Sequence, residues 1–211
     1  MDETGFRIGV GKDQLVVTKR KRQQYLGSVE NRESATVIEC ISASGDYAPA
    51  FLILTGRQHM SRWFQVGLLD SNASISVSDT GYTNDELSLA WLRHFIEYIR
   101  PRRVGFKSLV ILDGHGSHYT REFIQLCNDE NIVPFGLPPH LTHILQPLDV
   151  VVFQPLKYYH TKELDLLARD GLTDFTKLDF LSIIKDVRRK AIKKETIINS
   201  FKKTGIYPFD P

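Results

Sequence analysis

The feature that most constrains the fold is a short apolar strand that ends at an aspartate. Residues 107–112 predict this strand, which is wholly apolar from Leu109, and Asp113 follows it directly. Residues 120–128 predict a helix, and residues 132–137 predict a second strand. A strand, a helix and a strand at this spacing are typical of a parallel βαβ unit. The sequence therefore predicts an α/β fold with Asp113 at the carboxyl edge of a sheet.

Regular structure is predicted along most of the remaining chain. Residues 35–42 and 48–54 predict two strands joined by a tight turn, and the continuously apolar second strand should be covered on both faces. A helix over 84–100 has Thr83 as its expected cap. Further helices are expected over 155–169, 176–191 and 196–204. We therefore expect a mixed sheet flanked by helices over 1–170, with a helical C-terminal part over 171–211 packed on it.

Composition excludes several classes of protein. Hydrophobic residues make up 42% of the chain and charged residues 25%, close to the average of globular proteins. The longest apolar runs span about seven residues, whereas a membrane helix needs about 20, so no membrane contact is expected. The N-terminal sequence has no basic and apolar leader typical of secretion. Cys40 and Cys127 are expected to be free thiols in a reducing compartment.

Three aspartates are the candidates for a metal-dependent site. Asp113 is followed by a glycine-rich turn, and ligands of open α/β sheets bind outside the carboxyl ends of strands. Asp149 follows a proline-rich segment, and Asp2 begins a third acidic motif. Mg²⁺ prefers such oxygen ligands, and two ions can activate water and stabilise a leaving oxygen at a phosphodiester. The alternative for Asp113 and Asp149 is a structural role as caps of loops or helices.

Five segments share the order and residue types of one transposase family. They are Asp2–Phe6, Gly81–Asn84, Leu112–His118, Leu137–Val150 (Leu-Pro-Pro-His, then Gln-Pro-Leu-Asp-Val) and Lys203–Phe209. Together they resemble the DDE endonuclease domain of pogo-type transposases. This branch of the mariner superfamily includes Tigger and jerky proteins, fungal relatives and descendants of the centromere-protein-B type. The resemblance extends over essentially the whole chain.

The resemblance implies a ribonuclease-H-like fold and a defined chemistry. Carried over by position, the catalytic and metal-binding residues are Asp2, Asp113 and Asp149. They would hold two Mg²⁺ or Mn²⁺ ions for hydrolysis of DNA strands at element ends, followed by attack of the freed 3′-hydroxyl on target DNA. The resemblance also implies a nuclear protein whose partner is DNA. It is compatible with a homodimer as well as with a monomer. The alternative is a domesticated, inactive derivative that binds DNA or protein through the same fold.

Four histidines lie close to these aspartates in the sequence. His115, His118, His140 and His143 are expected to line the cleft, contact phosphate or order the carboxylates. Their two His-x-x-His pairs also allow a zinc site, although no glutamate stands where a zinc hydrolase of the His-Glu-x-x-His type places its base. Glu3 should point to the opposite face from Asp2, because side chains alternate along a strand.

A basic segment near the C-terminus is the candidate DNA contact. Its positive charges could neutralise phosphates, although the solvated face of amphipathic helices is an equal alternative. The predicted nucleic-acid-binding residues are Lys185, Arg188, Arg189, Lys190, Lys193 and Lys194.

The position of Asp2 leads to one expectation about activity. In the implied fold a catalytic aspartate ends a central strand, which needs about five preceding residues to pair with its neighbours. Only Met1 precedes Asp2 in this sequence. We therefore expect the first central strand to be truncated, and strand cleavage by residues 1–211 to be weak or absent.

Overall fold

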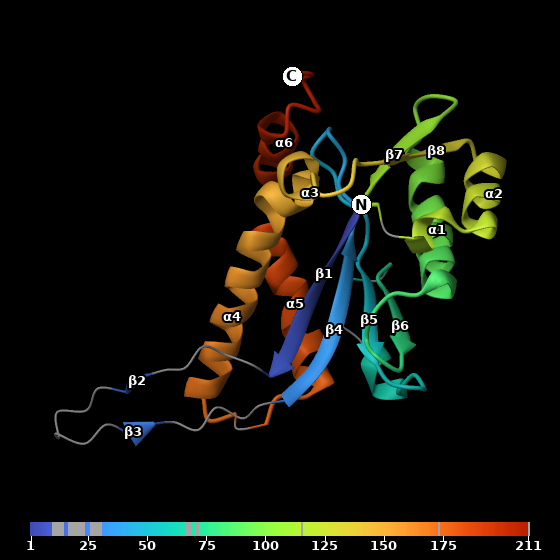
Figure 1. Cartoon of the computed structure of the whole chain (residues 1–211). Coiled ribbons are helices and arrows are strands. Elements are labelled where there is room, and N and C mark those ends of the chain that lie inside the picture. Colours follow the sequence, from blue (N-terminus) through green and yellow to red (C-terminus); the bar gives the residue numbers. More distant parts are fainter. Residues whose placement is uncertain are drawn as a thin grey trace.

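The fold consists of a four-stranded β-sheet and a separate parallel pair of strands between two groups of helices (Figure 1). The computed structural model describes residues 1–9, 15–16, 24–25, 31–65, 69–70, 72–114, 116–172 and 174–210. Helices α1 (Asp85–Ile99) and α2 (Arg121–Asp129) cover one face of the sheet. The other face is covered by α4 (Phe153–Arg169), α5 (Lys177–Ala191) and α6 (Lys194–Lys203).

The larger sheet has the order β1-β4-β5-β6. Strand β1 (Asp2–Gly9) is antiparallel to β4 (Asn31–Glu39), which is antiparallel to β5 (Phe51–Thr55). The predicted pair of strands joined by a turn is therefore confirmed. Strand β6 (Ser74–Ser78), parallel to β5, was not predicted, because three of its five residues are serines. The two-residue strands β2 (Leu15–Val16) and β3 (Gln24–Tyr25) form a separate pair.

The βαβ unit is present as predicted. Strands β7 (Ser108–Leu112) and β8 (Ile132–Gly136) are parallel, with α2 between them in the chain. Pro134 lies at the centre of β8. The amide of Leu137 donates to the carbonyl of Leu112, so the odd-numbered residues of this strand direct their backbone groups toward β7. Pro134, which has no N–H, therefore lies on the outer edge, the position where a strand accepts proline.

The remaining helices agree with the prediction except at two places. The cap of α1 is Asn84 and not Thr83, because the side chain of Asn84 accepts the Leu87 amide. Thr176 and Asp179 form the capping box that begins α5. The segment before α4 contains the short helix α3 (Thr142–Leu145) and a π-helical turn over Leu148–Val152, neither of which was predicted. Three short 3₁₀ helices span Ser61–Phe64, Arg100–Arg102 and Gly116–Tyr119.

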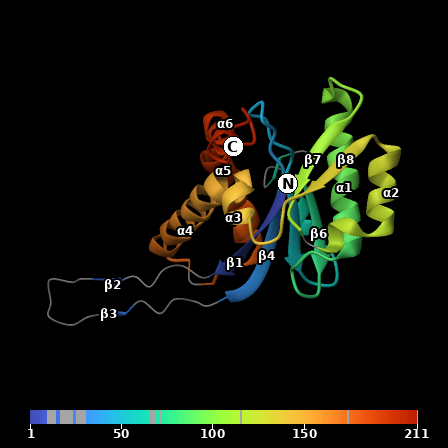
Figure 2. The same cartoon turned by 45° about the horizontal axis from the view of Figure 1, so that its top comes forward.

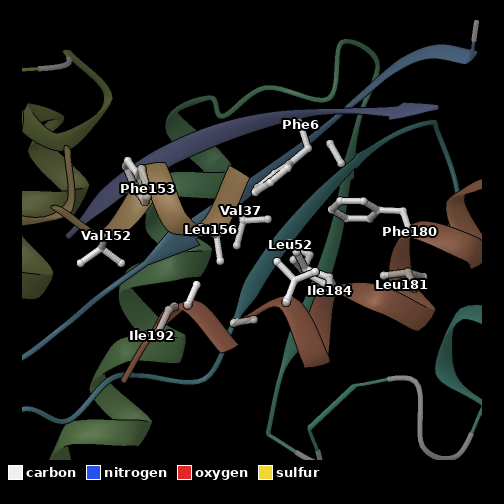
Figure 3. Packing of buried hydrophobic residues seen from close by; sticks show 14 of the residues in the cluster. Phe6, Val37, Leu52, Val152, Phe153, Leu156, Phe180, Leu181, Ile184 and Ile192 are labelled. Atoms are coloured by element: carbon white, nitrogen blue, oxygen red, sulfur yellow. The ribbon is translucent and has the colours of Figure 1, made fainter. Parts of the chain in front are cut away.

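Alternation along the strands builds a core on each face of the sheet. On β5, Leu52 and Leu54 pack toward α4 and α5, whereas Phe51 and Ile53 pack toward α1. Figure 3 shows the first of these cores, in which Phe180 of α5 lies among side chains from the sheet and α4. The apolar strand predicted over 48–54 is thus covered on both faces. Because α5 and α6 contribute to the same core as the strands, the helical part is packed on the sheet, and a boundary at residue 170 stays a prediction.

Asp2 begins its strand and does not end it, which corrects one expectation. Strand β1 continues for eight residues after Met1 and pairs with β4, with Asp2 opposite Glu39. It forms the edge of the four-stranded sheet, and its start lies beside β7 in both views (Figures 1 and 2). The amino group of Met1 donates to the carbonyl of Ile111 on β7 at 2.8 Å. The family pattern led us to expect a truncated strand that ends at Asp2. In the structure Asp2 begins β1, and the residues that follow it pair with β4.

A buried ion pair joins the end of β4 to α5. The Arg188 guanidinium donates to both carboxylate oxygens of Glu39 at 2.7 and 3.0 Å, and also to the carbonyl of Ala48 at 3.0 Å. The side chain of Glu39 is 0% exposed and that of Arg188 is 3% exposed. The carboxylate of Asp70 lies 3.7 Å from Arg188 but is half exposed. A bidentate pair of this kind compensates for much of the cost of removing both charges from water.

A second buried polar group, His160 of α4, packs between two phenylalanine rings. The ring centroids of Phe6 and Phe180 lie 4.8 and 5.6 Å from that of His160. Burial lowers the pKa of His160 to about 4, because the apolar surroundings disfavour the imidazolium form. The neutral ring is therefore the form that fits this core.

His160 should make the fold less stable in mild acid. The unfolded chain takes up the proton near pH 6.5, whereas the folded chain does so only near pH 4. Stability is thus fully present above pH 6.5 and falls by about 3 kcal/mol as the pH approaches 4. His160→Leu should remove this loss, as measured by urea unfolding at pH 7.5 and 4.5. His59→Leu, at an exposed position, is the control, and an equal pH effect in both variants would contradict the assignment.

Candidate functional site

The three predicted aspartates come together at one end of the sheet. Asp2 stands at the start of β1, Asp113 directly follows β7, and Asp149 lies in the π-helical turn before α4. The charges of Asp149 and Asp113 both act on Asp2, and that of Asp113 also acts on Asp149. Three carboxylates from three distant parts of the chain therefore share one electrostatic environment.

Asp2 is the most deeply buried of the three. Its exposed fraction is 7%, and the Glu3 amide donates to its carboxylate at 2.8 Å. Burial, followed by the charge of Asp149, raises the pKa of Asp2 to about 7. At neutral pH this carboxyl is therefore poised between its protonated and ionised forms.

Asp149 interacts with Asp2, whose side chain lowers the pKa of Asp149, while the charge of Asp149 raises the pKa of Asp2. Desolvation raises the pKa of Asp149, with a smaller contribution in the same direction from Asp113, while the charges of Lys157 and His143 act against them. Neighbouring carboxylates repel each other when both are ionised, and a cation between them would relieve that repulsion. The donor set consists of carboxylate oxygens only, which suits Mg²⁺ or Mn²⁺.

Asp113 is held by a buried histidine. The Nε2 atom of His118 lies 3.3 Å from an oxygen of Asp113, and Nδ1 lies 3.4 Å from the hydroxyl of Ser88 on α1. His118 is fully buried, whereas the Asp113 side chain is 29% exposed. A Cβ added to Gly116 would meet no atom within 4 Å. The arrangement fixes one side of Asp113 and leaves open space beyond the glycine-rich turn.

The other predicted histidines occupy different positions. His140 and His143 are exposed, and His143 is close enough to Asp149 to lower its pKa. His115 lies outside the described residues. Within the described part of the chain, no three His, Cys, Asp or Glu side chains stand in an arrangement ready to hold a metal. The aspartates are thus neighbours that do not form a preformed metal site, and the histidines within the described residues form no zinc cluster.

Glu3 points away from the aspartates, as its place in the strand predicts. Its carboxylate accepts the hydroxyl of Thr83 at 2.5 Å, just before α1 begins. The side chain therefore connects β1 to the helix on the opposite face of the sheet from Asp149.

Two residues near the aspartates were not identified from the sequence. The side-chain amide of Gln146, 1% exposed, donates to the carbonyl of Met1 at 3.0 Å. It thereby connects the start of β1 to the segment that contains Asp149. Lys157 of α4 places a positive charge near Asp149. The sequence signal for Gln146 was its place in Gln-Pro-Leu-Asp, three residues before the aspartate. Lys157 gave no such signal, because two helical turns separate it from Asp149.

The basic cluster is only partly available to DNA. Arg188 is wrong as a DNA contact, because it is buried and paired with Glu39. Lys185 is paired with Asp70, Arg189 with Asp186 and Lys190 with Glu163. Lys193 and Lys194 are exposed, and in the described part of the chain neither forms an ion pair.

A shallow cleft near Asp149 is bordered by further lysines. Lys202 and Lys203 of α6 line it together with Val150 and Val151, which directly follow Asp149. Helix α6 packs against the π-helical turn, so the fold holds these lysines beside the turn that contains Asp149.

Comparison with known proteins identifies the family. A model of the DDE superfamily endonuclease family matches residues 31–201. The chain is 36% identical over 212 residues to a Cochliobolus lunatus protein named MFS-type transporter clz9, and spans 100% of its own length but 23% of that protein. A human protein named pogo transposable element with ZNF domain is 22% identical over 135 residues, which are 64% of this chain and 9% of that protein. Within the described residues, no helix is both long and apolar enough to cross a membrane.

Solved structures show the same fold. The Mos1 strand transfer complex matches 94% of this chain and 52% of its own chain, with a TM-score of 0.51 and 13% identity. The Mos1 mariner paired end complex with Mn matches 94% and 53%, with a TM-score of 0.50 and 14% identity. The mixed sheet flanked by helices is thus the ribonuclease-H-like fold of a mariner transposase. The chain belongs to the DDE superfamily endonuclease family and is a DDE domain of the pogo and mariner type.

Proposed function

We propose that the domain hydrolyses phosphodiester bonds of DNA with divalent metal ions and transfers the cut strands, as a transposase does. The observation that supports this most directly is the convergence of the buried Asp2 with Asp113 and Asp149 in one acidic site. Carboxylates whose pKa values are raised by each other and by burial mark functional sites more often than structural ones.

Asp2, Asp113 and Asp149 would hold two Mg²⁺ or Mn²⁺ ions. The raised pKa of Asp2, caused by burial and by the charge of Asp149, supports this assignment, because a metal ion would relieve the same repulsion between carboxylates. The Mos1 complex with Mn, which has the same fold, supports a divalent metal. When bound, two such ions supply an activated water and stabilise the leaving oxygen.

The protein's own residues would position the site and the DNA. His118, fixed by Ser88, holds Asp113, and Gln146 ties the segment before Asp149 to the start of β1. Lys202 and Lys203 stand beside Asp149, where they can contact phosphates of a bound strand. The similar structures are a Mos1 strand transfer complex and a Mos1 mariner paired end complex, which supports DNA as the partner. A nuclear location would follow from this substrate.

The test is nicking of supercoiled plasmid by residues 1–211 at high protein concentration. We expect slow nicking that requires Mg²⁺ or Mn²⁺, and Asp113→Asn should reduce it by more than about 100-fold. This loss exceeds the 10–100-fold effect of disturbing a neighbour of a metal ligand. The matched control is Asp170→Asn, an exposed carboxylate at the far end of α4.

Two outcomes separate the candidate functions. Nicking that survives Asp113→Asn would rule out the proposed mechanism. If the unmodified chain neither nicks DNA nor gains thermal stability from Mn²⁺, the domain is a binding module derived from a transposase. In that case retention of plasmid DNA that weakens steeply with salt would identify DNA as its ligand.

A further inference from the structure

The loop that connects α1 to β7 presents two apolar side chains directly to solvent. It spans residues 100–107 and projects from the body of the fold in both views (Figures 1 and 2). Val104 is fully exposed and Phe106 is 76% exposed, with Gly105 between them. The two side chains form the apolar pair of the loop. Apolar groups this exposed gain free energy only when a binding partner covers them, because water solvates them poorly.

The same loop is strongly positive. It contains four basic residues and no acidic one; the basic residues are Arg100, Arg102, Arg103 and Lys107. One of these charges is compensated, because Arg100 pairs with Glu130 at 2.5 Å. Arg102 and Lys107 are exposed, and in the described ranges of the chain neither forms an ion pair. The apolar pair therefore stands between two exposed cations that have the charge needed to bind an anionic partner.

Contacts to α1 and to the start of β8 hold the base of the loop in place. The Arg102 guanidinium lies over the Tyr98 ring, 4.2 Å from its centroid, and donates to the Tyr98 carbonyl at 2.8 Å. On the other side, the amide of Ser108 donates to the carbonyl of Asn131 at 3.0 Å, where β7 begins to pair with β8. Because both ends are fixed, the loop loses less conformational entropy when a partner binds.

An apolar pair flanked by cations suits duplex DNA. Proteins that bend DNA insert apolar side chains between base steps, while neighbouring cations contact the phosphates. In this loop Val104 follows Arg103 and Phe106 precedes Lys107, so each apolar side chain has a cation next to it in the chain. A purely anionic surface would leave the apolar pair in water, and a purely apolar one would leave the cations without partners.

The loop also lies within reach of DNA bound at the aspartates. Phe106 and Asp113 are seven positions apart, and five of the residues between them form β7. At about 3.3 Å per residue, the two lie roughly 20 Å apart. This distance corresponds to about six base pairs of duplex DNA. A duplex whose scissile phosphate lies at the aspartates can therefore meet the loop within one turn of its helix.

We propose that the 100–107 loop is a second DNA contact, in which Val104 and Phe106 enter between base pairs while Arg102 and Lys107 bind the flanking phosphates. The choice of DNA as the partner rests on the proposed function, and the loop adds a contact that kinks the duplex away from the cleavage site. Such a contact depends on sequence mainly through how easily a base step unstacks.

The test of the apolar pair is binding of a duplex of about 20 base pairs that carries 2-aminopurine at several adenines. This base fluoresces more strongly when it is unstacked, and EDTA keeps the strands intact. Residues 1–211 should raise the fluorescence about twofold or more. Val104→Ser combined with Phe106→Ser should abolish the rise and weaken binding about tenfold, with no change in the salt dependence of the affinity. Leu166→Ser, at an exposed apolar position on α4, is the matched control.

The test of the flanking charge is the salt dependence itself. Lys107→Gln should lower the slope of log affinity against log salt concentration by about one, because one phosphate contact is lost. Lys162→Gln, at an exposed position on α4, should leave the slope as it is in the unmodified chain. Equal slopes in these two variants would contradict a phosphate contact at Lys107.

The proposal is overturned if the chain binds no duplex, or if it binds the duplex without a rise in fluorescence. Equal affinity in the Val104 and Phe106 double variant and in Leu166→Ser would also overturn it. If the double variant loses binding to a peptide of alternating glutamate and leucine but not to the duplex, the loop belongs to an acidic protein partner. Plasmid nicking without unstacking would refute this contact alone, whereas unstacking without nicking would refute only the proposed hydrolysis.

Discussion

Replacing Glu39 by glutamine should lower the free energy of unfolding by about 3 to 5 kcal/mol, the cost of leaving one member of a buried ion pair without its partner. The Arg188 guanidinium would keep its hydrogen bond to Ala48 but lose both contacts to a carboxylate. Asp70 lies 3.7 Å from Arg188 and is half exposed, so it compensates only in part. Urea unfolding at pH 7.5 measures the difference.

The exposed ion pair of Arg57 with Asp79 provides the matched control. Its atoms lie 3.3 Å apart, and the two side chains are 89% and 73% exposed. Arg57→Gln should change the free energy of unfolding by less than about 1 kcal/mol. The double variant Glu39→Leu with Arg188→Met should recover most of the lost stability, because apolar groups need no partner in a core. A loss below about 1 kcal/mol in Glu39→Gln would show that the buried pair contributes little.

Asp2→Asn should make the metal-free protein more stable at pH 8, by on the order of 4 kcal/mol. The folded state raises the pKa of Asp2 to about 7, whereas the unfolded chain ionises near pH 4. For a raised pKa, stability is fully present below the unfolded value and is lost as the pH rises through the folded value. Asparagine has no charge to bury and none to repel Asp149, so the variant avoids that loss.

The pH dependence and the response to metal test this explanation. In EDTA, wild type and Asp2→Asn should have similar stability at pH 4.5 and diverge by pH 8. Mn²⁺ should raise the melting temperature of wild type at pH 8 and leave that of Asp2→Asn nearly unchanged. Asp186→Asn, an exposed carboxylate on α5, should behave as wild type does. A variant less stable than wild type at pH 8 would show that ionised Asp2 does not destabilise the fold.

Local sequence patterns predicted the helices and strands whose formation depends mainly on neighbouring residues in the chain. The apolar strand before Asp113, the capped helix α5 and the βαβ unit were predicted because period and capping are visible in adjacent residues. Strand β6 was missed although Ile75 and Val77 alternate with its serines, because only two of its five residues are apolar and its pairing with β5 is decided by the sheet. The π-helical turn over Leu148–Val152 was missed as well, because it follows a proline-rich segment and is too short to give a periodic signal of its own.

The site shows the same limit. The sequence identified Asp2, Asp113 and Asp149 through their motifs, and the structure brings them into one electrostatic environment. The prediction of Arg188 as a DNA contact was wrong, because a run of basic residues does not show which of them faces a buried partner 149 positions away. Lys157 and Gln146 were missed for the related reason that their roles depend on chain segments that meet only after folding.

Proline at the centre of β8 has a consequence for how crowded copies of the protein behave. The outer edge of a sheet can recruit a strand from a neighbouring molecule, which is the first step toward aggregation. Pro134 has no N–H at the centre of that edge, so a strand added there would lack one hydrogen bond of the ladder. This single ring therefore acts as a gatekeeper against fibrillar association at the outer edge of β8.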